Sequence, residues 1–370
     1  MKKKSLALVL AVMLMTAATG CGSADKTAGA DSVSSTGAAS DKVEVTMFVW
    51  AGANQGVVPM AVAEQYMADH PDVTINVIES SNSEMYSKMV AGKETDPDHP
   101  IINFGYFNAS ITAKGINDDM WLALDETAIP NMARIPEEYH TDGDLGIIWG
   151  ISDFGIIYNP ELVDTPPVSW NDLWENDSFA GKVGLWDYLL YSYIPPVIEL
   201  HSELGASYEA PEAAFQYVAD HISQVNSLVT SADQLQNLLV SGEATVAPYS
   251  LQSAEVWKES GAPIEIVIPQ EGTIQFPYYL QVVKGTTDAQ KKVCYDMINL
   301  LLEADNLTEY ANQTGTPVLN VDSKVPEKYA DDPLFDLEKR SGISPDWVAM
   351  SVHNSEWNDL YERLVKTAIQ

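Results

Sequence analysis

The sequence predicts an α/β protein of two domains, and three observations support this prediction. The chain has 370 residues, which is enough for two domains of ordinary size. Apolar residues make up 46% of it, so a substantial core can form. Short runs rich in Ile, Val and aromatic residues alternate with segments of helical periodicity, and this alternation favours parallel sheets covered by helices.

Composition excludes some functions. The formal net charge of −33 excludes nucleic-acid binding, because proteins that neutralise nucleic-acid phosphates need clustered Lys and Arg. Strong acidity attracts cations, or simply reflects a solvated surface. The only cysteines are Cys21 and Cys294, so a disulfide framework is excluded. Cys294 lies in an apolar helical stretch, where we expect it to be a buried small hydrophobe.

The N-terminus has the pattern of a targeting segment. A positive start, Lys2–Lys4, precedes the apolar run Leu6–Met15 and the small residues before Cys21. This pattern resembles a lipoprotein signal over residues 1–20, with Cys21 as the lipidated first residue; an ordinary secretory signal is the alternative. Residues 21–41 are mostly small or polar and predict a flexible tether. We expect the protein on the outer face of the cell membrane, held by its lipid anchor only.

The first part of the chain alternates strand and helix. The expected strands are 43–50, 73–79 and 101–106, and the expected helices are 57–70 and 82–91. Ile147–Pro160 then contains two apolar runs that are separated by Ser152–Asp153. We predict two buried strands joined by a small polar break. They are either a crossing between two lobes or two neighbouring strands of one sheet.

The second part continues the alternation. Expected strands are 181–187, 242–249, 264–268 and 278–283, with the return crossing near 264–268. Expected helices are 169–174 with Ser169 as its cap, 213–221, 233–240, 291–302 and a closing helix, 347–365.

Common catalytic motifs are missing from the sequence. It contains no GxxxxGK[ST], GxGxxG or GxSxG pattern. The six histidines lie far apart with none at i, i+4, so metal-site spacing is missing, although distant ligands can still converge. We therefore expect no enzyme activity, no cofactor and no metal. A membrane-anchored hydrolase is the minor alternative.

Four short motifs resemble one protein family. They are Trp149–Gly150, GIIYNPEL at 155–162, SWNDLW at 169–174 and FAGKVGLWD at 179–187. Together they resemble the interlobe segment of extracellular solute-binding proteins of ABC importers. The nearest group is the spermidine/putrescine-binding type, with iron-binding and thiamine-binding cousins, and the resemblance runs over 43–320. It implies a two-lobe periplasmic-binding-protein-like fold of type II with a ligand cleft between the lobes.

The resemblance also implies a domain division and a mechanism. Lobe 1 would comprise 42–151 and 267–315, and lobe 2 would comprise 152–266 and 316–370. The monomeric protein would capture a small solute by hinge closure near Ile151–Ser152 and deliver it to the permease subunits of an ABC transporter.

Ligand-binding positions follow from the same resemblance, at strand ends of both lobes. They are Trp50, Tyr106, Asp187, Tyr188, Tyr191, Tyr249, Ser250, Phe276, Tyr278 and Thr316. Where the polyamine group carries acids, this chain has Tyr188, Tyr191 and Tyr278, and only Asp187 remains beside them. Aromatic faces with one carboxylate suit a small organic cation of the amine type, because ring quadrupoles attract ammonium groups.

Three alternatives stay open. Ferric iron needs two adjacent tyrosines in the second lobe, and the matching place here has a single Tyr249 followed by Ser250. Another small solute would also fit the fold. The same body could instead act as a ligand sensor for a membrane receptor.

Overall fold

A computed structural model of the protein describes residues 42–52, 54–336 and 342–369. The predicted signal, Cys21 and the whole of the predicted tether, up to residue 41, lie outside the described residues. Within the described part, we find no helix that has both the length and the apolar character needed to cross a membrane. Cys294 is fully buried, as expected.

The strands of the described residues form one mixed sheet. They are β1 (Val43–Trp50), β2 (Val73–Ser80), β3 (Phe104–Asn108), β4 (Trp121–Leu122), β5 (Ile147–Tyr158), β6 (Val183–Trp186), β7 (Val225–Val229), β8 (Val246–Ser250), β9 (Glu265–Val267), β10 (Thr273–Val283) and β11 (Gly342–Ile343). Their order is β2-β1-β3-β10-β5-β8-β6-β7, with β4 and β11 paired to β10 and β9 paired to β5.

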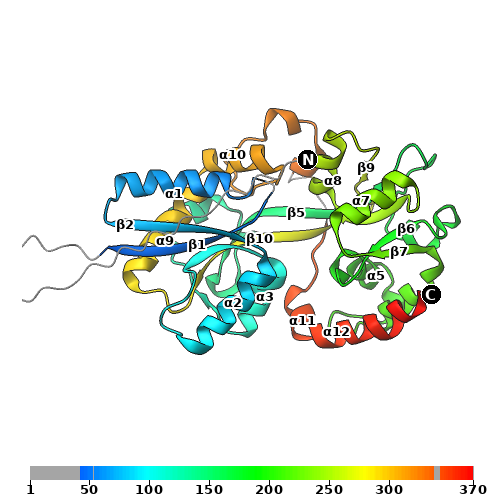
Figure 1. Cartoon of the computed structure of the whole chain (residues 1–370), viewed down its shortest axis with the longest axis horizontal. Helices are drawn as coiled ribbons and strands as arrows, with labels where there is room; N and C mark the ends of the chain where they lie inside the picture. Colours follow the sequence, from blue (N-terminus) through cyan, green and yellow to red (C-terminus); the bar gives the residue numbers. More distant parts are fainter. Residues whose placement is uncertain (1–41, 53, 337–341, 370) are drawn as a thin grey trace, which may run out of the picture. The chain divides into compact units, whose positions relative to one another are not determined.

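Two parallel parts of this sheet are joined by two long antiparallel strands. The strand pairs β1–β2 and β1–β3 are parallel, and so are β6–β7 and β6–β8. Between these parts, β5 and β10 pair with each other in the antiparallel direction, and Figure 1 shows them side by side. Apolar residues recur along VEVTMFVW and VTINVIES, which is why these segments identified their strands from sequence; β1 is the more deeply buried of the two.

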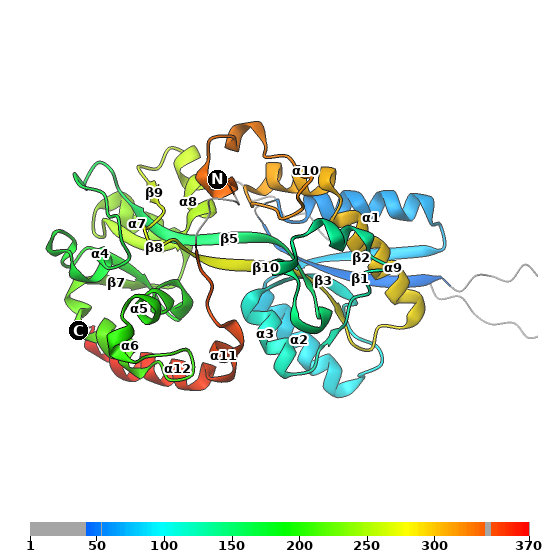
Figure 2. The same ribbon diagram turned by 180° about the vertical axis from the view of Figure 1, so that it is seen from behind.

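Helices cover the sheet. They are α1 (Val57–Asp69), α2 (Asn82–Thr95), α3 (Ala109–Asn117), α4 (Asp172–Glu175), α5 (Ile194–Leu200), α6 (Glu212–Asp220), α7 (Ala232–Ser241), α8 (Leu251–Glu259), α9 (Asp288–Leu301), α10 (Ala304–Thr314), α11 (Trp347–Val352) and α12 (Asn354–Leu360). The C-terminal α11 packs beside α3, as Figure 2 shows, although more than 200 residues separate them along the chain.

Each of the two long strands, β5 and β10, contributes residues to two different apolar cores. Ile151 of β5 belongs to a core built around β1, β3 and α9, whereas Phe154 belongs to a core built around β6, α5 and α12. On β10, Phe276 belongs to the second core and Leu280 to the first. Ser152 and Asp153 therefore mark a boundary between cores within a continuous strand.

A buried polar cluster fills this boundary. The Asp153 carboxyl accepts a hydrogen bond from the Thr273 hydroxyl at 2.6 Å and another from Gln252 Nε2 at 3.2 Å. Gln252 Oε1 accepts from the Ser152 hydroxyl and from the Asp153 backbone N–H. Because Asp153 is fully buried, these partners offset the cost of removing its carboxyl group from water.

Two predictions about the crossings were wrong. Ile147–Pro160 holds one strand, β5, rather than two, because Ser152 and Asp153 stay in the ladder opposite β10 and find polar partners there. The return crossing is β10 and not 264–268, since β9 is a three-residue strand that pairs only with β5.

Several element boundaries also differ. Ser169 does not cap a helix, because Asn171 precedes α4 and the Asp172 carboxylate accepts from the Ser169 N–H. The expected closing helix divides into α11, α12 and a π-helical turn, Tyr361–Lys366. The sequence analysis missed α3, α8 and α10, whose spans carry many polar or small residues, and α5, which has two prolines in its first turn.

The polar cluster yields a stability prediction. Thr273→Val keeps the shape of the side chain but removes its hydrogen bond to Asp153, so we expect the free energy of unfolding to fall by about 1.5–3 kcal/mol. Urea unfolding followed by circular dichroism measures it. The control is Thr95→Val, which removes an exposed hydroxyl bond to Ala91 and should cost less than about 0.5 kcal/mol. Equal losses in both variants would contradict this account of the boundary.

Candidate ligand-binding cleft

One cavity lies where α2 and α3 face the C-terminal helices. Its volume is about 250 Å³, and its walls also include the segment after β6 and one residue of β10. The lining residues are Asn82, Ser83, Asn108, Ser110, Ile111, Lys114, Tyr188, Leu189, Leu190, Tyr191, Phe276, Trp347, Met350, Ser351, Asn354, Trp357 and Asn358. Three of the residues predicted from sequence, Tyr188, Tyr191 and Phe276, are among them.

Aromatic side chains form one wall of this cavity. The ring centroids of Tyr191 and Phe276 lie 5.1 Å apart, and Trp347 lies 4.9 Å from Phe276 and 5.6 Å from Tyr191. Phe154 of β5 supports Tyr191 from behind at 5.5 Å. Tilted and edge-on contacts of this kind hold the rings in fixed orientations, so they offer a preformed apolar surface to a solute.

The opposite wall is polar and comes from two helix N-termini. Ser81 caps α2 by accepting from the Glu84 N–H, and Asn108 caps α3 by accepting from the Ile111 N–H. Asn82 and Lys114 project from these helices into the lining. Lys114 is the single charged residue among those that line the cavity in the described part of the chain.

Two buried polar atoms belonging to lining residues lack a hydrogen-bond partner. Asn82 Oδ1 is an acceptor on the α2 side, and Trp347 Nε1 is a donor on the α11 side. Buried polar groups in folded proteins are nearly always hydrogen-bonded, so an unpaired acceptor and an unpaired donor on two lining residues require an explanation. A bound solute with a donor and an acceptor of its own would supply one.

A second aromatic cluster lies next to this wall. Tyr106, Trp149 and Tyr310 are almost completely buried, and the Tyr106 ring lies 4.5 Å from that of Trp149. Trp50 contacts Tyr278 at 4.4 Å and Tyr106 at 5.7 Å. Burial raises the pKa of Tyr278 to about 12, so its hydroxyl stays neutral at ordinary pH. These residues pack together behind the cavity rather than among the residues that line it.

Phe276 connects the two aromatic groups. Its ring lies 6.4 Å from that of Tyr278, two residues further along β10. The structure thus brings together five of the predicted residues: Trp50, Tyr106, Tyr191, Phe276 and Tyr278.

Three predicted residues lie elsewhere. Tyr249 stacks between Trp186 at 5.8 Å and Trp257 at 4.5 Å. Ser250 caps α8 with its hydroxyl, and Thr316 is buried to 3% exposure. None of the three lines the cavity.

Asp187 and Tyr188 contact the C-terminal π-helical turn. The Tyr361 hydroxyl donates to Asp187 at 2.5 Å, and Lys366 Nζ lies 3.9 Å from the same carboxylate. Lys366 also donates to the Tyr188 hydroxyl, lies 4.5 Å from the centre of its ring, and pairs with Glu362. Burial and the bond to Asp187 raise the pKa of Tyr361. The one predicted carboxylate therefore already has a cation of this chain beside it.

Sequence analysis did not find Asn82, Lys114 or Trp347. Trp347 was visible only as the first residue of the expected closing helix, and Asn82 as the first residue of another. The signal that unites them is the contact between α3 and α11, which no local pattern encodes.

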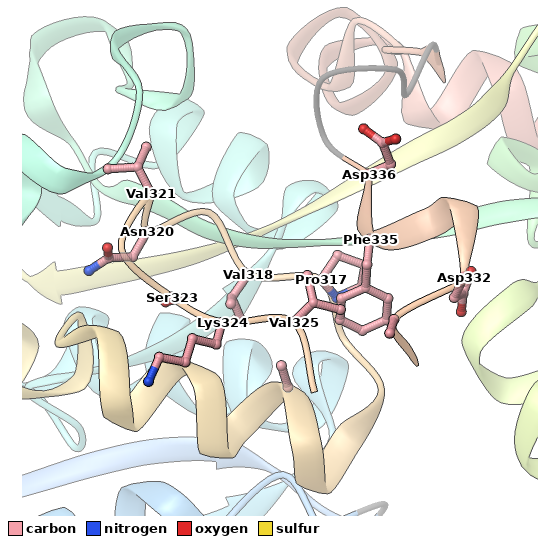
Figure 3. Close-up of a pocket in the computed structure, with 12 residues that line it drawn as sticks. Pro317, Val318, Asn320, Val321, Ser323, Lys324, Val325, Asp332, Phe335 and Asp336 are labelled. Atoms are coloured by element: carbon pink, nitrogen blue, oxygen red, sulfur yellow. The ribbon is translucent and has the colours of Figure 1, made fainter. Parts of the chain in front are cut away.

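A larger cavity of about 400 Å³ lies on the side of α10. Figure 3 shows its lining, which comes from α10 and from the segment 317–336. It contains one aromatic residue, Phe335, together with Lys324, Asp332 and Asp336. Because its walls lack the aromatic surface and the strand and helix ends of the smaller cavity, we take the smaller one as the candidate cleft.

The fold agrees with comparisons to known proteins. The profile of the bacterial extracellular solute-binding protein family matches residues 61–336. The chain belongs to this family, whose members bind solutes for ABC transporters and are not enzymes.

Two groups of relatives illustrate the family. The chain is 24% identical to spermidine/putrescine-binding periplasmic protein 1 of Haemophilus influenzae, over 96% of this chain and 94% of that protein. A spermidine/putrescine substrate-binding protein of Streptococcus pneumoniae shares the fold at a TM-score of 0.68 with 17% identity, covering 89% of this chain and 100% of that one. AfuA of Actinobacillus pleuropneumoniae, with fructose-6-phosphate bound, shares the fold at a TM-score of 0.67 with 19% sequence identity. The match covers 88% of this chain and 99% of that one.

The contact between Asp187 and Tyr361 can be tested by stability. Tyr361→Phe removes a buried hydroxyl that donates to a carboxylate, so we expect the free energy of unfolding to fall by about 1–3 kcal/mol. Urea unfolding measures the change. Tyr217→Phe is the matched control, because that hydroxyl donates to the exposed Glu175. If Tyr361→Phe costs no more than the control, the π-helical turn does not fix Asp187.

Proposed function

We propose that this solute-binding protein captures a small organic cation of the amine type in the cleft lined by Tyr191, Phe276 and Trp347. The observation that carries the proposal is an aromatic wall in a cavity that is also lined by Asn82, whose Oδ1 is an unpaired acceptor among the described residues. Ring faces attract an ammonium group by roughly 0.5–2 kcal/mol each, and an N–H of the solute would satisfy the amide oxygen. The names of the polyamine-binding relatives support the same ligand class.

The proposed ligand differs from an extended polyamine in its charge pairing. The cavity lining of the described residues contains no carboxylate, and Asp187 is already in contact with Lys366. Two or more ammonium groups buried without counter-charges would be costly. A monocation with a flat or quaternary head therefore suits this lining better than a chain of several ammonium groups.

Capture requires two lobes that close on the solute. We infer that lobe 1 comprises 42–151 and 267–315 and lobe 2 comprises 152–266 and 316–370, joined through β5 and β10. A solute that touches α2 on one side and Trp347 on the other binds best when both sides are close, so it shifts the population toward the closed form. The closed monomer then delivers its solute to the permease.

A second candidate is a solute that carries an anionic group, and Lys114 favours it. Its ammonium group, in the last turn of α3, is the one charge among the described lining residues. Asn108 and Ser110, at the N-terminus of the same helix, also line the cavity, and backbone N–H groups and the helix dipole attract anions there. A zwitterion with its cationic end on the aromatic wall would satisfy both sides.

The ligand prediction is tested by a thermal-shift screen followed by calorimetry. We expect choline-type and other monoamine solutes to raise Tm, because a ligand at about 100 times its Kd adds roughly 2.7 kcal/mol. Tyr191→Leu should then weaken binding by about 3-fold to 30-fold. Tyr249→Leu is the control, since it removes the same ring from a stack outside the cavity.

Two results would contradict the proposal. Unchanged affinity in Tyr191→Leu would move the site away from this cavity. A response to sugar phosphates or ferric iron with none to amines would replace the ligand class, and phosphate binding lost in Lys114→Met would establish the second candidate.

We also propose that Cys21 carries a lipid that holds the protein on the outer face of the membrane. The positive start, the apolar run and the small residues before Cys21 support this proposal. We expect the Cys21→Ser variant to leave the membrane fraction and to appear among the soluble secreted proteins. Immunoblotting of the two fractions measures this shift. Retention of the variant in the membrane fraction would contradict lipid attachment at this residue.

A further inference from the structure

Three side chains outside the cleft converge on one point. A carboxylate oxygen of Glu126, a ring nitrogen of His140 and a carboxylate oxygen of Asp144 all lie within 4.8 Å of one another. Glu126 Oε1 lies 3.3 Å from His140 Nδ1. None of these residues lines the cleft, and all three belong to the connection between β4 and β5.

The backbone holds the three side chains in place. The Asp144 carbonyl accepts from the Leu124 N–H at 2.8 Å, which ties the Asp144 loop to the turn that carries Glu126. The Thr141 carbonyl accepts from the Asp144 N–H at 3.0 Å. Asp144 has a φ of 54°, a left-handed conformation that is uncommon for residues other than glycine. The loop therefore maintains a costly backbone conformation at the residue that contributes the third side chain.

Hydrogen bonds outside the cluster define the state of His140. Its Nε2 lies 3.2 Å from the Met132 carbonyl and 3.1 Å from the Ile135 carbonyl. Carbonyl oxygens only accept, so Nε2 must carry a proton. In the neutral imidazole, Nδ1 then has a free lone pair, and this lone pair faces carboxylate oxygens that also carry lone pairs. A proton on Nδ1 or a bound cation would satisfy this arrangement.

We propose that Glu126, His140 and Asp144 form a site for a divalent transition-metal ion of the Zn²⁺ type. One imidazole nitrogen and two carboxylate oxygens are ligands that Zn²⁺ accepts, with water in the remaining position. Ligand atoms of tetrahedral Zn²⁺ at about 2.0–2.2 Å lie roughly 3.4 Å from one another, which matches the Glu126–His140 separation. The bond from Nε2–H to a backbone carbonyl is the outer-shell contact that metal-binding histidines ordinarily have.

The ion would tie two segments of the connection together. Glu126 lies in the turn that follows β4, and Asp144 lies three residues before β5 begins. A bound ion would thus fix the start of the strand that passes between the two cores, at a place separate from the solute cleft. The site is independent of the proposed solute.

The experiment is a calorimetric titration of the full chain with Zn²⁺ alone in a buffer that does not chelate metals. We expect one equivalent to bind with heat and to raise Tm. His140→Gln and Asp144→Asn should each weaken that binding by about 100-fold or more, because each removes a direct ligand. Circular dichroism verifies that both variants remain folded, and Glu126→Gln supplies a third variant at an exposed position.

The matched control is His99→Gln. His99 Nδ1 also lies beside a carboxylate, that of Asp96 at 3.0 Å, but the pair is exposed and the described structure shows no third ligand there. We expect this variant to bind Zn²⁺ like the parent chain. The proposal is overturned if the parent chain binds no Zn²⁺ equivalent. It is also overturned if His140→Gln and Asp144→Asn bind as the parent does.

Discussion

The pairing of β5 with β10 is the constraint on which the rest of the structure depends. These two strands alone join the parallel strands β1–β3 to the parallel strands β6–β8 in one sheet. Two apolar cores meet on them, and a solvent-free boundary between cores would leave buried polar groups without hydrogen-bond partners. Asp153, Thr273 and Gln252 fill that boundary with a closed hydrogen-bond network. Phe276 of the same strand lines the cleft. One strand, β10, therefore both joins the two parallel parts of the sheet and contributes to the wall of the cleft.

The C-terminal segment completes the cleft and also changes its chemistry. α11 brings Trp347 against Phe276 and Tyr191, which makes the wall aromatic. The π-helical turn that follows brings Lys366 and Tyr361 to Asp187. An internal ammonium group thus occupies the neighbourhood of the carboxylate that a cationic solute would otherwise use. This arrangement is why we favour a solute with a single, diffuse positive charge.

The sequence alone predicted the elements whose signal is local. Val43–Trp50 and Val73–Ser80 carry recurring apolar residues typical of strands, and their ends were placed within one residue. The break at Ser152–Asp153 was interpreted as the end of a strand, because a polar pair within an apolar run looks the same whether the backbone stops or a distant Gln252 satisfies it. Tyr191 and Phe276, which family resemblance marked as ligand-binding, line the cavity, and their role in binding stays a prediction. The sequence analysis did not identify Trp347 and Lys114 as cavity residues, because only the packing of α11 on α3 brings them together.

The most direct test of the central claim is hydrogen–deuterium exchange of the full chain with and without the solute that raises Tm most. Our account predicts slower exchange in α11, at the N-terminal turns of α2 and α3, and in β10 around Phe276, because these segments line the cleft. Exchange around Tyr249 and Trp257 should not change. Protection confined to 317–336, around the larger cavity on the α10 side, would contradict the account and move the solute site there.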